Sequence, residues 1–124
     1  MANSPRILAE LKLRCFYARD EAHSAHLATT SYAQHKALNS FYEDIAGLVD
    51  DLVESYQGVY GIVEDRPNIT MPSGGMVPIL TQLRKWIMAN RDSIGVTDDT
   101  ELQNDIDSIV TLINRTMYKL KNLR

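Results

Sequence analysis

Three histidines and a row of carboxylates are the residues of this sequence that could do chemistry. With side chains placed about 100° apart around a helix, His35, Asp50 and Glu54 fall on one face. Asn39 and Glu43 lie on the same face. An imidazole nitrogen and carboxylate oxygens on one rigid stripe suit iron, manganese or zinc. The alternative interpretation is that these five residues form the solvated face of an amphipathic helix.

The other two histidines, His23 and His26, lie one helical turn apart. Asp20 and His23 have the i,i+3 spacing of carboxylate and histidine in di-iron bundles. A di-iron centre within one subunit needs carboxylates from all four helices, and the second half of the chain offers no matching pair, so we expect none within one chain. Alternatively, the two histidines make ordinary structural hydrogen bonds. We expect His26 to face inward, because it lies one turn beyond Ala22.

The elements that must position these residues are helices. Apolar residues at intervals of three and four predict four of them, at residues 5–28, 31–57, 78–92 and 100–122. Ser4 is a good N-cap for the first helix, and Gly58 is placed to end the second. Pro78 is expected to open the third helix, and Thr100 with Gln103 has the spacing of a capping box for the fourth.

The segment 59–77 contains several prolines and glycines and has no sustained period. Loops of this length are uncommon in compact domains, so this one needs a geometric reason. At about 3.3 Å per extended residue it could run the whole length of the preceding helix, which is about 40 Å. We therefore expect an all-α fold: one helical domain over residues 1–124, forming a four-helix bundle with a long crossover between helices 2 and 3, as in ferritin-like bundles.

Composition sets limits on the class of protein. The chain has 124 residues, of which 44% are hydrophobic and 23% charged, as expected for one globular domain. Its net charge of −3 gives no overall positive field, so nucleic acid is not the expected partner. Cys15 is the lone cysteine, and no secretory signal or membrane-spanning run is evident. We therefore expect a soluble protein that is not secreted and has no membrane partner.

Several runs of the sequence carry a resemblance. The run from His23 to Asp44, the positions Asp50 and Glu54, and the later runs 102–107 and 116–120 resemble a family of small uncharacterised bacteriophage proteins. More distantly, the second predicted helix is similar to that of Dps-type mini-ferritins. In that family, ferroxidase ligands on the first two helices meet across a dimer interface.

The mini-ferritin resemblance implies a set of metal ligands. His35, Asp50 and Glu54 match three ligand positions, and Asn39 stands where the family has an aspartate. The histidine of the family's first helix would correspond to His23. The chain has Ser24 where the family has a tryptophan, and it lacks the lysine-rich tail that binds DNA. The implied cofactor is iron, with manganese or zinc as alternatives.

Two functional classes follow. In the first, His23 and His35 of one subunit and Asp50 and Glu54 of a partner bind iron, with ferroxidase-like activity or storage, and His26, Asn39 and Glu43 are additional candidate ligands. This class requires a homo-oligomer, at least a dimer. In the second, the chain is a non-enzymatic phage helical oligomer, either a structural protein or a binder of a host protein or small ligand. Either class places the protein in the cytoplasm of the infected host or in the virion.

Overall fold

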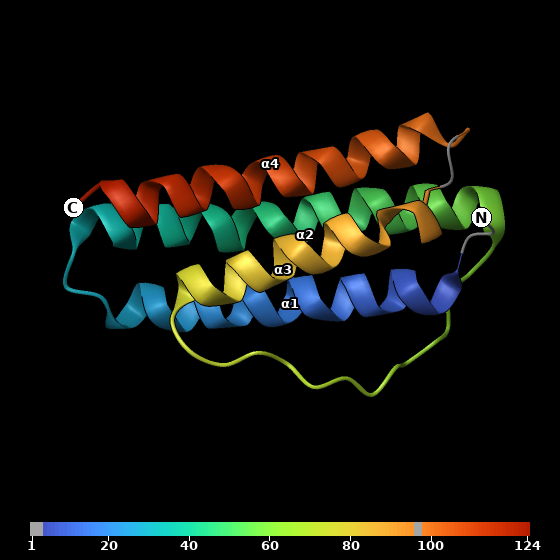
Figure 1. Cartoon of the computed structure of the whole chain (residues 1–124). Coiled ribbons are helices and arrows are strands. Elements are labelled where there is room, and N and C mark those ends of the chain that lie inside the picture. Colours follow the sequence, from blue (N-terminus) through green and yellow to red (C-terminus); the bar gives the residue numbers. More distant parts are fainter. Residues whose placement is uncertain (1–3, 96–97) are drawn as a thin grey trace.

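The computed structural model describes residues 4–95 and 98–124. These residues form four α-helices, one short 3₁₀ turn and no strand: α1 (Pro5–Ala28), α2 (Tyr32–Tyr60), α3 (Met76–Asn90), η1 (Arg91–Ser93) and α4 (Thr100–Asn122). Figure 1 shows α1 and α2 antiparallel, and a connection between α2 and α3 that runs along the side of the bundle. This connection makes α3 parallel to α2 and leaves α4 antiparallel to both. The all-helical prediction is confirmed for the described part of the chain.

The first helix pair forms as the sequence predicts. The Oγ atom of Ser4 accepts a hydrogen bond from the backbone N–H of Ile7 (3.2 Å), which is an N-cap of α1. The Oγ atom of Ser31 accepts from the N–H of Gln34 (3.3 Å) and caps α2 in the same way. Only residues 29–31 separate the two helices. Because the link is this short, the end of α1 lies beside the start of α2.

Two predicted helix ends were wrong. Gly58 lies inside α2, which continues to Tyr60 and ends at Gly61, whose φ of 98° is the left-handed conformation that glycine adopts readily. The third helix begins at Met76, two residues before Pro78. Proline is tolerated there because the N–H groups of the first turn have no partner within the helix.

The predicted capping box was also wrong. Thr100 is the first residue of α4, and the N-cap residue is Asp99, whose side chain makes no capping bond. The side chain of Gln103 instead donates to the Oδ1 atom of Asp92 (3.3 Å) and to the carbonyl oxygen of Gly95. A contact with η1 and with Gly95, which follow α3 in the chain, therefore replaces the local one.

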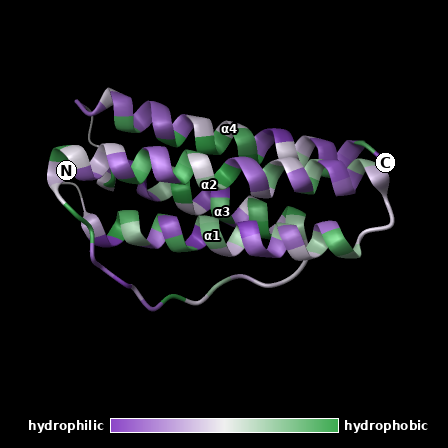
Figure 2. Ribbon diagram, turned by 180° about the vertical axis from the view of Figure 1, so that it is seen from behind, coloured by the Kyte–Doolittle hydropathy of each residue, from purple (hydrophilic) through white to green (hydrophobic). Residues whose placement is uncertain are grey.

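The core lies along the bundle axis, and all four helices contribute to it. Fully buried side chains include Leu11 on α1, Ile45 on α2 and Ile109 on α4. Figure 2 shows apolar and polar residues interspersed along each helix, as expected of amphipathic helices with one face in a core. Met88 on α3 is 44% exposed, because α3 turns that side toward solvent. Within the described residues, no helix is long and apolar enough to cross a membrane.

Candidate functional site

The turn between α1 and α2 brings two histidines together. His26 lies in the last turn of α1 and His35 in the first turn of α2. The Nδ1 atom of His26 donates to the carbonyl oxygen of His35 (2.8 Å), and Nδ1 of His35 donates to the carbonyl oxygen of His26 (2.9 Å). The two imidazole rings stack with their centroids 3.7 Å apart. These reciprocal hydrogen bonds tie the end of α1 to the start of α2.

The hydrogen bonds fix the tautomer of this histidine pair. A carbonyl oxygen can only accept, so each ring carries a hydrogen on Nδ1, and Nε2 is the nitrogen that a neutral ring offers as an acceptor. A metal ion lies in the plane of each imidazole that binds it. Two rings stacked 3.7 Å apart therefore cannot direct both Nε2 atoms at one ion. His26 is 8% exposed, so the prediction that it faces inward is confirmed.

The third histidine joins the same cluster from the outside. His23 is exposed, and its ring stacks on that of Tyr42 with the centroids 4.2 Å apart. Tyr42 donates its hydroxyl hydrogen to the Oδ1 atom of Asn39 (2.8 Å). Asn39 is thus engaged by a neighbour on its own helix. His23, His26, His35 and Tyr42 form one cluster of rings at the α1–α2 end of the bundle.

The carboxylates predicted to complete a metal site lie elsewhere. Glu43, Asp50 and Glu54 are exposed on α2. At 1.5 Å per residue, Asp50 is about 22 Å along the helix from His35. Within residues 4–95 and 98–124, no group of three or more His, Cys, Asp and Glu side chains is arranged to hold a metal ion. The predicted ligands are therefore not gathered within one chain, and a site built from them requires a second chain.

A second candidate site is a groove between α2 and α4, with a volume of about 610 Å³. From α2 it is lined by Glu43, Asp44, Gly47, Leu48 and Asp51. From α4 it is lined by Asp107, Ser108, Thr111, Leu112 and Arg115. The two leucines are half-buried and supply an apolar floor, whereas the charged residues of both helices form its rim.

The rim of the groove is acidic. In the part of the chain that the structure describes, Glu43, Asp44 and Asp51 make no ion pair. Asp105 and Glu101 add further carboxylates on α4, and burial together with the nearby carboxylates of Asp51 and Glu101 raises the pKa of Asp105. Three exposed carboxylates and one exposed cation, Arg115, therefore face the groove without a described ion-pair partner.

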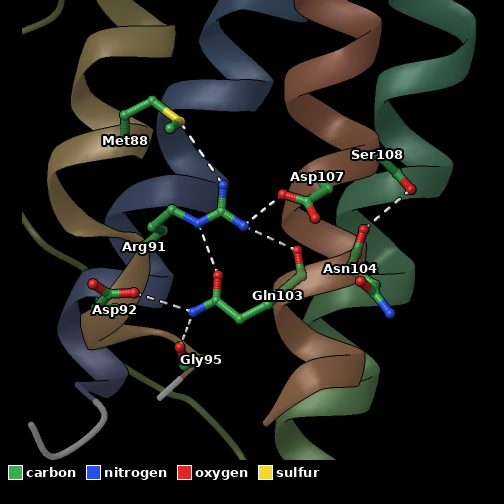
Figure 3. A network of polar contacts seen from close by, with 8 residues as sticks. All are labelled: Met88, Arg91, Asp92, Gly95, Gln103, Asn104, Asp107 and Ser108. Atoms are coloured by element: carbon green, nitrogen blue, oxygen red, sulfur yellow. Dashed lines mark hydrogen bonds and ion pairs between the residues drawn. The ribbon is translucent and has the colours of Figure 1, made fainter. Parts of the chain in front are cut away.

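Asp107 is the acidic lining residue that does have a partner. Figure 3 shows the guanidinium of Arg91 between α3 and α4, where Nη2 donates to Oδ1 of Asp107 (2.6 Å) and Nε donates to Oε1 of Gln103 (2.7 Å). Nη2 also donates to the carbonyl oxygen of Gln103 (3.2 Å). This network holds the end of α3 against α4 and neutralises the charge of Asp107.

Our sequence interpretation missed the groove, although the sequence contains a signal for it. The lining residues of α2 and of α4 have the same spacing, i, i+1, i+4, i+5 and i+8, beginning at Glu43 and at Asp107. In both helices the position i+5 is a leucine and the position i is an acid. Two helical stripes of one pattern indicate facing walls only when the helices are known to be neighbours, which the sequence does not reveal.

The comparisons with known proteins identify a family. A family model described as "Family of unknown function (DUF5856)" matches residues 26–120, so the chain belongs to this family. The chain is also similar to an uncharacterised 14.6 kDa protein from the mobD-ri intergenic region of Enterobacteria phage T4, with 29% identity over 99 residues, which cover 79% of this chain and 75% of the T4 protein. No solved structure matches significantly. The predicted resemblance to small phage proteins is thereby confirmed.

Proposed function

We propose that this member of the DUF5856 family is a non-enzymatic binding protein that recognises a host protein through the groove between α2 and α4. The observation that carries the proposal is the combination of an apolar floor with an acidic rim that lacks described ion pairs. The imidazoles of His26 and His35, by contrast, are engaged in hydrogen bonds to backbone carbonyls. Such bonds suit a structural role.

The groove has the two components that protein recognition needs. Leu48 and Leu112 leave apolar surface in contact with water, and covering it yields about 25 cal/mol for each Å² buried. The carboxylates around these leucines contribute specificity and association rate more than affinity. Both walls are long helices packed on one core, so the surface is largely pre-formed and little order is lost on binding.

The proposal is tested by capture of partners from a lysate of host cells. Immobilised wild-type protein and three variants are exposed to host lysate, and the bound proteins are quantified by mass spectrometry. Leu112→Glu places a charge on the groove floor, whereas Leu27→Glu places the same charge on a leucine that is 73% exposed and lies outside the groove. Thr111→Trp fills the groove from an exposed position, which limits the risk of misfolding.

We expect wild type and Leu27→Glu to retain the same partner, and Leu112→Glu and Thr111→Trp to lose it. Circular dichroism melts establish that each variant is folded. Equal capture by all four proteins would refute a role for the groove.

A second candidate function is a mini-ferritin-like iron site shared between subunits. The α2–α3 connection along the bundle is typical of ferritin-like folds, and a neutral His35 with its hydrogen on Nδ1 would offer Nε2, as metal-bound histidines do. His23 and His35 of one chain would face Asp50 and Glu54 of another. Anaerobic titration with ferrous iron, oxygen consumption and light scattering test it. A strict monomer that binds no iron would eliminate this candidate.

A further inference from the structure

The dimensions of the groove fit a helix. Its lining spans nine residues on each wall, from Glu43 to Asp51 and from Asp107 to Arg115, which is about 12 Å or two helical turns. The two walls are antiparallel helices. A third helix packs into a furrow between two helices by placing its apolar side chains over the floor.

Gly47 lies on the α2 wall, where the lack of a side chain favours close packing of a bound segment against α2. It is in the interior of a helix of 29 residues, where glycine is among the poorest helix formers. A Cβ atom built at this position meets nothing within 4 Å, so packing within the chain does not require glycine. The absent side chain would let the backbone of a bound segment approach α2. Gly58, which is on the same helix and equally open, lies outside the groove and provides a matched control.

The charged residues that line the groove indicate whether a bound segment is acidic or basic. Glu43, Asp44 and Asp51 lack described ion pairs, and Arg115 is the one basic residue among the lining residues. A second copy of this chain bound through the same face about a twofold axis would bring carboxylates against carboxylates. Lysine and arginine side chains of a different protein would instead complement the rim.

We propose that the groove binds a basic amphipathic helix of a partner protein, with apolar residues over Leu48 and Leu112, its backbone close to Gly47, and lysine or arginine side chains at Asp44 and Asp51. This inference rests on the proposed function and names the partner class of the same site. The helix-in-groove mode requires only that the partner segment be apolar on one face and basic on its flanks.

The probe is a synthetic peptide of about 18 residues made of leucine and lysine, with the leucines on one helical face. Its binding to the full chain is measured by fluorescence anisotropy. One pair of variants changes charge equally: Asp44→Asn with Asp51→Asn in the groove, and Glu64→Gln with Asp65→Asn in the α2–α3 connection. A second pair adds the same methyl group to α2: Gly47→Ala in the groove and Gly58→Ala outside it.

We expect the groove charge pair to weaken binding about fivefold and Gly47→Ala to weaken it about tenfold. The two control variants should bind as wild type does. Both glycine variants should melt at a higher temperature than wild type, since alanine is the better helix former.

Three results would overturn the inference: no binding, equal loss with both charge pairs, or full binding by Gly47→Ala. Equal loss would indicate attraction to net charge alone. If the peptide fails while Leu112→Glu still abolishes partner capture from lysate, the groove binds a partner of another chemistry and the proposed function stands. If Leu112→Glu captures normally, the proposed function itself fails.

Discussion

The substitution His35→Ala separates a structural role of the histidines from a metal-binding one. The ring of His35 donates to the carbonyl oxygen of His26 and stacks on the His26 ring. That carbonyl is in the last turn of α1, where the helix supplies no partner. The loss of one hydrogen bond and one ring stack costs about 1 kcal/mol each, roughly 2 kcal/mol together. For a domain of this size, this lowers the melting temperature by roughly 8 °C.

The assay is urea unfolding followed by circular dichroism, with a chelator and with added ferrous iron. We expect His35→Ala to be destabilised equally in both conditions. Glu54→Ala changes an exposed side chain of the same helix, so its free energy of unfolding should stay within about 0.5 kcal/mol of that of wild type. The reasoning fails if His35→Ala is as stable as wild type with chelator while iron stabilises only the wild type. That pattern would favour the shared iron site.

Three further predictions concern buried or crowded groups. Gly95→Ala should lower stability by about 1 to 2 kcal/mol in urea unfolding, because its Cβ would lie 2.9 Å from the Cβ of the fully buried Leu102; an unchanged midpoint would contradict this. Cys15 should not react with a thiol reagent in the native protein, since burial raises the pKa of its thiol to about 12; rapid native labelling would show that the site opens. Asp105→Asn should raise stability near pH 7, because burial and the Asp51 carboxylate raise the pKa of Asp105, so that its charged form costs stability as pH rises through that pKa. The gain should shrink on acidification, and a gain that is independent of pH would exclude this cause.

Most of the fold could be predicted from the sequence because each helix has an apolar stripe and clear end signals. Ser4 caps the first helix as predicted. The wrong predictions concern helix ends, where more than one residue can end the helix or more than one group can accept a hydrogen bond. Gly58 can continue a helix when Gly61 provides the left-handed end, and the side chain of Gln103 bonds to η1 and to Gly95 in place of the N-terminus of α4.

The candidate site could be predicted only in part, because spacing along one helix does not reveal which helices are neighbours. The histidine pair depends on the short link that sets His26 beside His35, and the sequence indicated the link but not the reciprocal bonds. The groove depends on the packing of α2 against α4. Its floor residues Leu48 and Leu112 look like ordinary members of two amphipathic stripes until the helices are placed side by side.

The two proposed functions use different flanks of α2, which makes them separable by mutation. By helical position, Asp50 and Glu54 lie on the side that carries His35, and neither lines the groove. Asp44 and Asp51 do line it. Glu43 is both a candidate metal ligand and a lining residue of the groove, so its substitution does not distinguish the two functions. An iron-linked dimer should therefore tolerate changes at Asp44 and Asp51, and groove binding should tolerate changes at Asp50 and Glu54. If both pairs affected the same activity equally, neither assignment of α2 would hold.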